Sequence, residues 1–494
     1  MASSKKRLIT AAEVESHGRL DDLWIVVEEK VYDMTRFGPE HPGGQAIIQL
    51  YAGRDATEAY KEIHEPSLIM TNLRPEEKIG DLDPRTSFRD PPPRKGEKIE
   101  RNSAEKPPLQ TLINLFDFEE AARHSLSHKN FAFISGASND NITRDANRNL
   151  FDKIWFRPRV MRNVAKVSTK SRLMGHDVAL PLWISPAGIG KAGGPEGELA
   201  LSRGAAASGI IQTISTTASY PLLEILDAAP PEQPFFFQLY INKDRCKTEE
   251  LISIINNCTQ IKALWVTVDL PVVSKREADE RLKLEAIYSS GITDTRSSFS
   301  DGKGTGLART AGSYIDPSFC WEDLQWLRKL TKLPIVLKGI QSAMDARIAM
   351  RMGCQGIVVS NHGGRALDTA PASILILLEL HRECPEVFDH MEVFLDGGIR
   401  RGSDVLKAIC LGASGVGLGR PFMYAINYGK EGVEHLVNVL KDEVETAMRL
   451  VGLRSLANAD ASMVNTAELD ALVPRGSRHP YARNRPRKPN NFHL

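Results

Sequence analysis

Eight short apolar runs, separated by segments long enough to form helices, constrain the fold of most of this chain. They are Leu182–Ser185, Ile210–Ile214, Phe235–Tyr240, Leu264–Val268, Ile335–Lys338, Gly356–Ser360, Val393–Asp396 and Gly415–Leu418. Runs of this length that are rich in β-branched and aromatic residues are typical of buried strands. Because strand and helix alternate eight times, the sequence predicts a closed (β/α)8 barrel, the TIM-barrel fold.

Polar side chains gather at the C-terminal ends of these runs, where barrels of this kind place their chemistry. They are Ser215, Gln238, Tyr240, Thr267, Asp269, Lys338, His362, Arg365, Asp396 and Arg420. A barrel with a purely structural role would have no reason to collect them on one rim. The sequence therefore predicts a functional site at this end of the barrel.

The sixth run leads into the turn Ser360–Arg365, which has the sequence SNHGGR. The imidazole of His362 can transfer a proton near neutral pH. The guanidinium of Arg365 can hold a carboxylate through two parallel hydrogen bonds. The pair indicates an enzyme that acts on a small carboxylic acid, whereas the alternative is a glycine-rich turn with an incidental histidine and arginine.

Glycines and arginines follow the last two runs, at the usual phosphate site of this fold. Asp396–Arg400 has the sequence DGGIR, and Gly417–Pro421 has the sequence GLGRP. Backbone N–H groups and arginines at these positions can bind one phosphate group. A single phosphate suits a mononucleotide such as FMN.

Several of these segments resemble the family of FMN-dependent α-hydroxy acid dehydrogenases and oxidases. The similar segments are Ser135–Ala137, Phe237–Tyr240, Val266–Asp269, Leu337–Gly339, SNHGGR and Asp396–Gly402, and the resemblance covers most of residues 111–455. It implies that FMN is bound by Ser185, Ser215, Gln238, Thr267, Lys338, Asp396, Gly397, Gly398, Arg400, Gly419 and Arg420.

The same resemblance implies five catalytic residues for the oxidation of a 2-hydroxy acid. His362 would be the general base, and Asp269 would orient it and stabilise its imidazolium form. Arg365 would clamp the substrate carboxylate, and Tyr240 would donate a hydrogen bond to the substrate. Lys338 would stabilise negative charge on the reduced flavin. Tyr240, His362 and Arg365 are thus the predicted substrate-binding residues.

One position departs from the family pattern, which usually has two tyrosines before the Ser-Gly-Ala of its first segment. Here the sequence is Ala132-Phe133-Ile134-Ser135-Gly136, and we place Ala132 at the first tyrosine. Gly188 and Thr217 are also smaller or more polar than a lactate pocket would lead us to expect. These differences predict a substrate larger than lactate, such as an aryl or longer-chain 2-hydroxy acid.

The first part of the chain carries a different motif, His41-Pro42-Gly43-Gly44, with a second histidine, His64, 23 residues after His41. Two imidazoles presented from turns suit the two axial positions of a haem iron. Trp24–Val27, Val31–Phe37, Ala52–Thr57 and Ile79–Leu82 resemble the cytochrome b5 family in the same order. This resemblance implies an α+β domain that binds haem b through His41 and His64.

A proline-rich segment with few apolar residues separates the two parts. The predicted organisation is a haem domain at 7–83, a linker at 84–110, an FMN-binding barrel at 111–460 and a basic tail at 461–494. This domain order is similar to the flavocytochrome b2 type, which implies electron transfer from the substrate through FMN and haem to cytochrome c. The alternatives are an oxidase that uses oxygen directly and a non-catalytic haem and flavin redox sensor.

Bulk properties agree with a water-soluble enzyme. The formal net charge of +1 gives no indication of nucleic-acid binding, and no apolar run approaches the roughly 20 residues of a membrane span. The N-terminal residues do not resemble a signal peptide or a typical transit peptide. We therefore expect a cytoplasmic protein, with the mitochondrial intermembrane space as the alternative, and the family resemblance implies a homotetramer.

Overall fold

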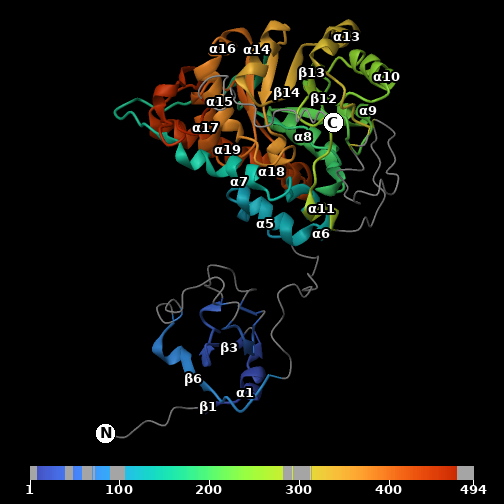
Figure 1. Ribbon diagram of the computed structural model, residues 1–494. Coiled ribbons are helices and arrows are strands. Elements are labelled where there is room, and N and C mark those ends of the chain that lie inside the picture. Colours follow the sequence, from blue (N-terminus) through green and yellow to red (C-terminus); the bar gives the residue numbers. More distant parts are fainter. Residues whose placement is uncertain are drawn as a thin grey trace, which may run out of the picture. The chain divides into compact units, whose positions relative to one another are not determined.

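The structure is a computed structural model that describes residues 8–19, 21–38, 48–49, 51–57, 60, 69, 73–88, 106–281, 292, 312 and 314–474. The chain divides into two compact units, Met1–Arg101 and Asn102–Leu494 (Figure 1). Each unit has hydrophobic cores of its own, because the core clusters of the described residues draw members from one unit only.

The N-terminal unit is built on a small mixed sheet with the strand order β1-β6-β4-β3-β2, and β5 pairs with β3. The strands are β1 (Leu8–Ile9), β2 (Gly18–Arg19), β3 (Asp22–Val27), β4 (Lys30–Asp33), β5 (Arg54–Asp55) and β6 (Lys78–Leu82), and helix α1 spans Ala11–Ser16. Strand β3 is apolar over nearly its whole length and is buried on both faces, which gives the unit two small cores.

The C-terminal unit is a closed barrel of eight parallel strands, each hydrogen-bonded to the next along the chain. The strands are β10 (Leu182–Ile184), β11 (Ile211–Ser215), β12 (Phe235–Leu239), β13 (Ile261–Thr267), β14 (Ile335–Ile340), β15 (Gly356–Val359), β16 (Glu392–Asp396) and β17 (Gly415–Leu418). Strand β17 pairs with β10 and closes the barrel. The predicted (β/α)8 fold is confirmed.

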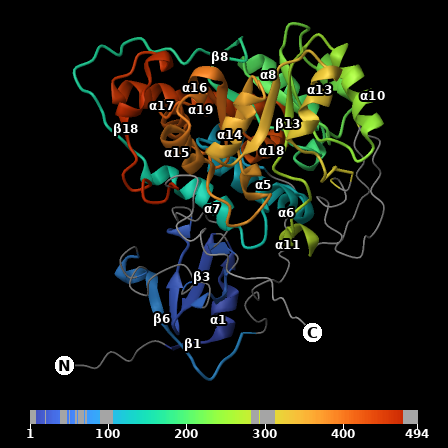
Figure 2. The same cartoon turned by 45° about the horizontal axis from the view of Figure 1, so that its top comes forward.

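Helices surround the barrel strands in both ribbon views (Figures 1 and 2). They include α8 (Gly197–Ser208), α9 (Leu222–Asp227), α10 (Arg245–Asn256), α13 (Leu324–Leu330), α14 (Ala343–Arg351), α15 (Ser373–Glu383), α16 (Val387–His390), α17 (Gly402–Cys410), α18 (Arg420–Ala425) and α19 (Gly429–Val451). Before the barrel come α5 (Leu115–Ser125), α6 (His128–Ser135) and α7 (Ile142–Asn149), and α11 (Glu277–Glu280) follows β13. Short strands complete the unit: β7 (Trp155–Phe156) pairs with β18 (Val464–Asn465), and β8 (Ser171–Leu173) pairs with β9 (His176–Val178).

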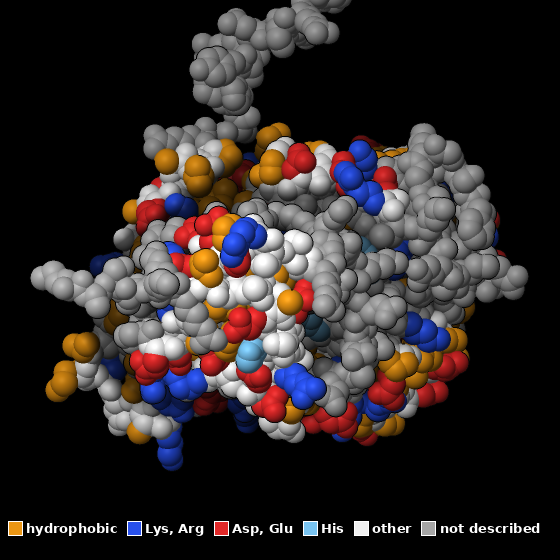
Figure 3. All heavy atoms as spheres, turned by 90° about the horizontal axis from the view of Figure 1, so that it is seen from below, with side chains coloured by type: hydrophobic (Ala, Val, Ile, Leu, Met, Phe, Trp, Pro, Cys, Tyr) orange, Lys and Arg blue, Asp and Glu red, His pale blue; other side chains and the backbone are white. Residues whose placement is uncertain are grey.

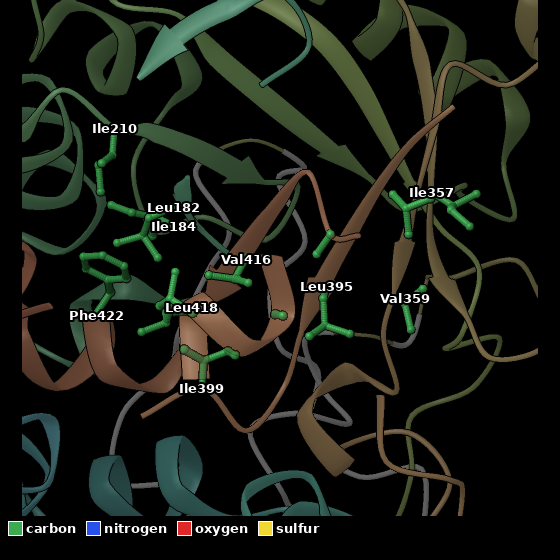
Figure 4. Close-up of a cluster of buried hydrophobic side chains, with 14 of the residues drawn as sticks. Leu182, Ile184, Ile210, Ile357, Val359, Leu395, Ile399, Val416, Leu418 and Phe422 are labelled. Atoms are coloured by element: carbon green, nitrogen blue, oxygen red, sulfur yellow. The ribbon is translucent and has the colours of Figure 1, made fainter. Parts of the chain in front are cut away.

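Side chains alternate between two separate cores along the barrel strands, as the period of two in a β-strand requires. Outward-facing residues such as Leu182, Ile184 and Leu395 join the large core between strands and helices (Figure 4). Inward-facing residues form an aromatic core, in which the rings of Trp183, Trp265 and Phe394 lie 5.1–5.2 Å apart. The barrel interior is therefore filled.

The same alternation explains where the polar rim comes from. Two residues after an inward-facing core residue, the next inward-facing position lies above the aromatic core, at the C-terminal end of the strand. These pairs are Trp183 and Ser185, Phe236 and Gln238, Trp265 and Thr267, Val336 and Lys338, Val358 and Ser360, and Phe394 and Asp396. Because alternate residues of each strand face inward, these polar side chains form a ring at the C-terminal end of the barrel.

Among the residues that the structure describes, the face drawn in Figure 3 has no large patch of charged side chains of a single sign. Acidic and basic side chains are interspersed on the face of Figure 3. Within the described part of the chain, none of the helices combines the length and the apolar character needed to cross a membrane.

Candidate active site

His362 lies at the centre of a short chain of polar contacts on the barrel rim. Its Nδ1 atom is 3.0 Å from Oδ1 of Asp269, whose side chain is fully buried behind it. Its Nε2 atom is 3.5 Å from the hydroxyl of Tyr240, at the limit of a hydrogen bond. Asp269 can therefore fix the orientation of the ring and leave Nε2 free to exchange a proton.

The environment lowers the pKa of both members of this pair. Burial lowers the pKa of His362, and the carboxylate of Asp269 offsets this only in part. Burial raises the pKa of Asp269, but His362 and Lys338 outweigh it, so that the pKa of Asp269 is below its usual value. At neutral pH the site therefore holds a neutral imidazole beside an ionised carboxylate.

Lys338 brings a buried positive charge to the floor of the site. Its ammonium is 3.4 Å from Oδ2 of Asp396 and donates to the hydroxyl of Ser360 at 3.3 Å. Burial alone would lower the pKa of Lys338, but Asp396 and Asp269 outweigh it and raise the pKa. The amine is thus charged and can stabilise an anion that forms above it.

Two arginines with buried guanidiniums lie next to each other in the lining of the same cavity. Arg365 donates to the backbone carbonyls of Phe133, Ile134 and Gly136 at 2.7–3.0 Å, at the C-terminal end of α6. Arg276 donates to the carbonyl of Arg365 at 3.4 Å, and its Nε atom has no hydrogen-bond partner among the residues that the structure describes. Burial first, and then the repulsion between the two guanidiniums, lowers the pKa of Arg365 to about 9. Such a pair favours the binding of an anion between them.

The polar rim residues form a connected shelf over the aromatic core. Ser215 donates to Oε1 of Gln238 at 3.2 Å, and Nε2 of Gln238 donates to the hydroxyl of Thr267 at 3.0 Å. The hydroxyl of Ser185 and Oδ1 of Asp396 are buried without a partner in the described part of the chain. Buried polar atoms without partners indicate a bound group that is not protein. Hydroxyls, amides and a carboxylate in this arrangement fit the isoalloxazine and ribityl parts of FMN.

The predicted phosphate residues lie where β16 and β17 end. Gly397 and Gly398 have φ values of 95° and 89°, a backbone conformation that favours glycine. Arg400 contacts Glu119 at 2.9 Å, while Arg420 donates to the carbonyls of Gly136 and Gly363 at 3.2 and 2.9 Å.

A single cavity of about 530 Å³ connects these parts of the site. Of the predicted site residues, it is lined by Ser185, Ser215, Tyr240, Lys338, His362, Arg365, Asp396, Gly397, Gly398, Arg400, Gly419 and Arg420. Gln238, Thr267 and Asp269 lie behind the lining and contact residues that form it. Arg276 also lines the cavity. Sequence reasoning does not identify Arg276, because this residue lies after β13 in a polar segment without the periodicity of a helix or strand.

Of the two residues that stand where the family usually has tyrosines, Phe133 lines the cavity and Ala132 does not. Phe133 lines the cavity beside Arg365, with the guanidinium 5.4 Å from the ring centre, whereas Ala132 is buried and does not line it. Both residues lie on α6, where one residue turns the side chain by about 100°. At this wall the cavity is therefore lined by a phenyl ring without a hydroxyl, and Ala132 does not contribute to the lining.

Gly188 and Thr217 do line the cavity, on neighbouring loops that follow β10 and β11. A Cβ atom on Gly188 would lie only 2.0 Å from Oγ1 of Thr217, so the two positions share one small space. Oε1 of the buried Glu198 accepts from the backbone of Gly190 and Ser219 at 2.7 and 2.9 Å. This carboxylate, which sequence reasoning did not single out, joins the two loops.

The two predicted haem ligands, His41 and His64, lie outside the described residues.

Comparison with known proteins identifies both units. The sequence model of the FMN-dependent dehydrogenases matches residues 122–466, and that of the cytochrome b5-like heme/steroid binding domain matches residues 10–83. The chain is 40% identical over 481 residues to an L-lactate dehydrogenase (cytochrome) of Saccharomyces cerevisiae, covering 94% of this chain and 81% of that protein. It is 40% identical over 360 residues to the human 2-hydroxyacid oxidase 2, covering 73% of this chain and all of that protein.

Solved structures agree with these relatives. A flavocytochrome b2 mutant with pyruvate bound is 40% identical, with a TM-score of 0.68 over 78% of this chain and 95% of that one. A mandelate oxidase with (S)-4-hydroxymandelic acid is 35% identical, with a TM-score of 0.66 over 72% of this chain and 98% of that one.

The cavity thus lies in a barrel that uses FMN, and the small sheet belongs to a haem-binding domain. The chain is a member of the FMN-dependent dehydrogenase family in which a cytochrome b5-like domain precedes the catalytic barrel.

Proposed function

We propose that this protein oxidises an L-2-hydroxy acid to the 2-oxo acid and passes the electrons through haem to cytochrome c. The observation that carries the proposal is the arrangement of His362, backed by Asp269 at 3.0 Å, in one cavity with Arg365 and Lys338. A relative that shares nearly the whole chain is an L-lactate dehydrogenase (cytochrome), which supports the same overall reaction.

Each group on the cavity wall has a task in this reaction. The neutral His362 accepts a proton from the hydroxy acid as the α-carbon is oxidised, and Asp269 stabilises the imidazolium that results. Bound FMN supplies the two-electron acceptor. The Tyr240 hydroxyl, 3.5 Å from His362 Nε2, is placed to hold the substrate oxygen next to the base. Lys338 stabilises negative charge at the floor of the site.

The carboxylate of the substrate binds to Arg365, and Arg276 assists it. Both guanidiniums are buried next to each other, and neither forms an ion pair with a residue that the structure describes. A carboxylate placed there would be held by charge-assisted hydrogen bonds and would relieve the repulsion between the two cations.

The substrate is bulkier than lactate. Gly188 and Thr217 line one side of the cavity without a large side chain, and Leu270, Val273 and Ile315 provide apolar surface in its lining. An aryl or longer alkyl group would remove this surface from water, which contributes roughly 25 cal/mol per Å² of apolar area. A mandelate oxidase with a similar barrel has been solved with (S)-4-hydroxymandelic acid, and a point mutant of flavocytochrome b2 has been solved with benzoylformate, which supports an aryl group.

An anaerobic panel of L-lactate, L-mandelate and L-2-hydroxyoctanoate tests both parts of the proposal. We expect every acid that reacts to bleach the flavin band, and we expect a higher kcat/KM for mandelate or 2-hydroxyoctanoate than for lactate. A preference for lactate would contradict the size of the substrate but not the reaction. If none of a broad set of 2-hydroxy acids bleaches the flavin, the reaction itself is wrong, and a redox sensor becomes the better account.

An oxidase is the second candidate, because relatives that match only the barrel include 2-hydroxyacid oxidases. In this case oxygen would reoxidise the flavin, and the haem domain would be auxiliary. Parallel measurements of oxygen consumption and cytochrome c reduction with the same substrate separate the two. The relay predicts that cytochrome c is reduced several-fold faster than oxygen is consumed.

We also propose the remaining attributes that the sequence leads us to expect. These are haem ligation by His41 and His64, assembly into a homotetramer, and a cytoplasmic location with the mitochondrial intermembrane space as the alternative.

A further inference from the structure

Three successive residues of the SNHGGR turn have the left-handed backbone conformation. The φ values are 60° at His362, 63° at Gly363 and 76° at Gly364. Glycine adopts this conformation freely, but at a histidine the Cβ atom approaches the following carbonyl oxygen too closely. The backbone that carries the imidazole is therefore strained, and surrounding contacts must hold it.

Asn361, the residue before His362, is the first of these contacts. Its side-chain oxygen accepts from the backbone N–H of Gly364 at 3.0 Å and from Nδ2 of Asn147 at 2.8 Å. Its own Nδ2 donates to Oδ1 of Asn147 at 2.8 Å and to the carbonyl of Pro371 at 2.9 Å. All four hydrogen bonds that this amide can make are thus formed, in a side chain with no exposed surface.

Asn147 completes the pair from α7, which lies far away in the sequence. The two amides bond to each other twice, and Oδ1 of Asn147 also accepts from the backbone N–H of Ser373 at 3.0 Å. Asn147 is only 1% exposed. A reciprocal amide pair fixes the orientation of both side chains, since turning either one would place like groups against each other.

Asn147 also packs against the turn after β16. A Cβ atom on Gly398 would lie 2.1 Å from the carbonyl oxygen of Asn147, and one on Gly397 would lie 3.2 Å from its Nδ2. One residue of α7 thus touches the turn that carries His362 and the turn that leads to the predicted phosphate residues. Neither Asn147 nor Asn361 lines the cavity, so neither can contact the substrate directly.

We infer that Asn147 is a positioning residue, which acts through Asn361 to hold the strained turn and so aims the imidazole of His362 at the substrate. The inference rests on the proposed role of His362 as the base. A base displaced by about 1 Å can lose on the order of 100-fold in rate, so the loss should appear in the chemical step.

The test is Asn147→Asp in the full-length holoenzyme, which keeps the size of the side chain but cannot donate to Asn361. L-lactate and L-mandelate are the probes, and rates are expressed per bound FMN. We expect kcat and the anaerobic rate of flavin reduction to fall by at least about tenfold, with KM and the FMN content unchanged. The matched control is Asn149→Asp, an exposed asparagine of the same helix, which should stay within about twofold of wild type.

If Asn147→Asp loses FMN, Asn147→Ser provides the same test, because it removes both amide contacts without adding a charge. Wild-type rates per bound FMN in either variant would overturn the inference. Loss of FMN from both variants would also overturn it, since Asn147 would then have only a structural role. Failure of the proposed function is distinguishable from these results, because in that case the wild-type flavin is not reduced by either acid.

Discussion

At the scale of single residues, the protonation of His362 sets the pH range in which the site works. The imidazole must be neutral to accept a proton, and burial holds its pKa below the usual 6.5. The acidic limb of kcat/KM should therefore lie below pH 6.5. The enzyme is active above this limb, and it loses activity as the pH falls through the pKa of His362 in the folded protein.

The substitution Asp269→Asn tests whether Asp269 controls the pKa of His362. Asp269 raises the pKa of His362, so its neutralisation should move the acidic limb to still lower pH. The imidazolium formed in the reaction also loses its counter-charge, and we expect kcat to fall by roughly 10³-fold. The pH profile of kcat/KM measures both effects, and the exposed Asp227→Asn is the control. An unshifted limb with a small loss of rate would show that Asp269 does not act on His362.

Phe133 provides a second residue-scale prediction. Its ring lines the cavity beside Arg365 and lacks the hydroxyl that the family usually places there. Phe133→Tyr should add a hydrogen bond to the substrate carboxylate and lower KM for L-lactate by about tenfold. Phe319→Tyr, on a ring that does not line the cavity, should leave KM unchanged. An unchanged KM in Phe133→Tyr would mean that this wall does not contact the carboxylate.

His362, Phe133 and Arg276 show how much of the site can be predicted from the sequence alone. The motif around His362 indicates its chemistry because a base and a carboxylate binder lie three residues apart in one turn. Which of Ala132 and Phe133 lines the cavity depends on how helix α6 is rotated about its axis, and a short motif does not determine that rotation. Arg276 reaches the cavity from a polar segment without periodicity, and only the tertiary fold brings it next to Arg365.

At the scale of elements, the turn after β16 and helix α7 form a close contact that tolerates no side chain. Gly398 has a φ of 89°, and a Cβ atom there would lie 2.1 Å from the carbonyl oxygen of Asn147. Gly398→Ala should push α7 away and greatly weaken FMN binding. Gly175→Ala, at an exposed glycine, is the matched control, since its φ of 80° is also positive but no heavy atom would lie within 4 Å of the added Cβ atom. Absorbance at the flavin band after dialysis measures the result, and equal FMN retention in both variants would contradict it.

The barrel strands show why the fold was predictable in more detail than the site. Alternation along β10 to β17 is visible in the sequence, and it determines which residues face the aromatic core and which face the helices. The same period places Gln238, Thr267 and Lys338 on the rim, so their location follows from the sequence as well. The buried amide pair of Asn147 and Asn361 does not, because it joins elements 214 residues apart.

At the scale of the whole molecule, the two units have separate cores and separate cofactors. A fragment of residues 102–494 should therefore fold, bind FMN and have its flavin reduced by substrate at the full-length rate. If haem carries the electrons onward, this fragment should reduce ferricyanide but should lose nearly all cytochrome c reductase activity. Cytochrome c reduction by the fragment at the full-length rate would assign the haem domain an auxiliary role.

The most direct test of the account is anaerobic stopped-flow spectroscopy of the full-length protein at the flavin and haem bands. On mixing with its best 2-hydroxy acid, the flavin band should bleach first, and the haem should then be reduced at least as fast as the steady-state turnover with cytochrome c. Haem reduction that is slower than turnover would contradict the relay, and a flavin band that no 2-hydroxy acid bleaches would contradict the proposed reaction.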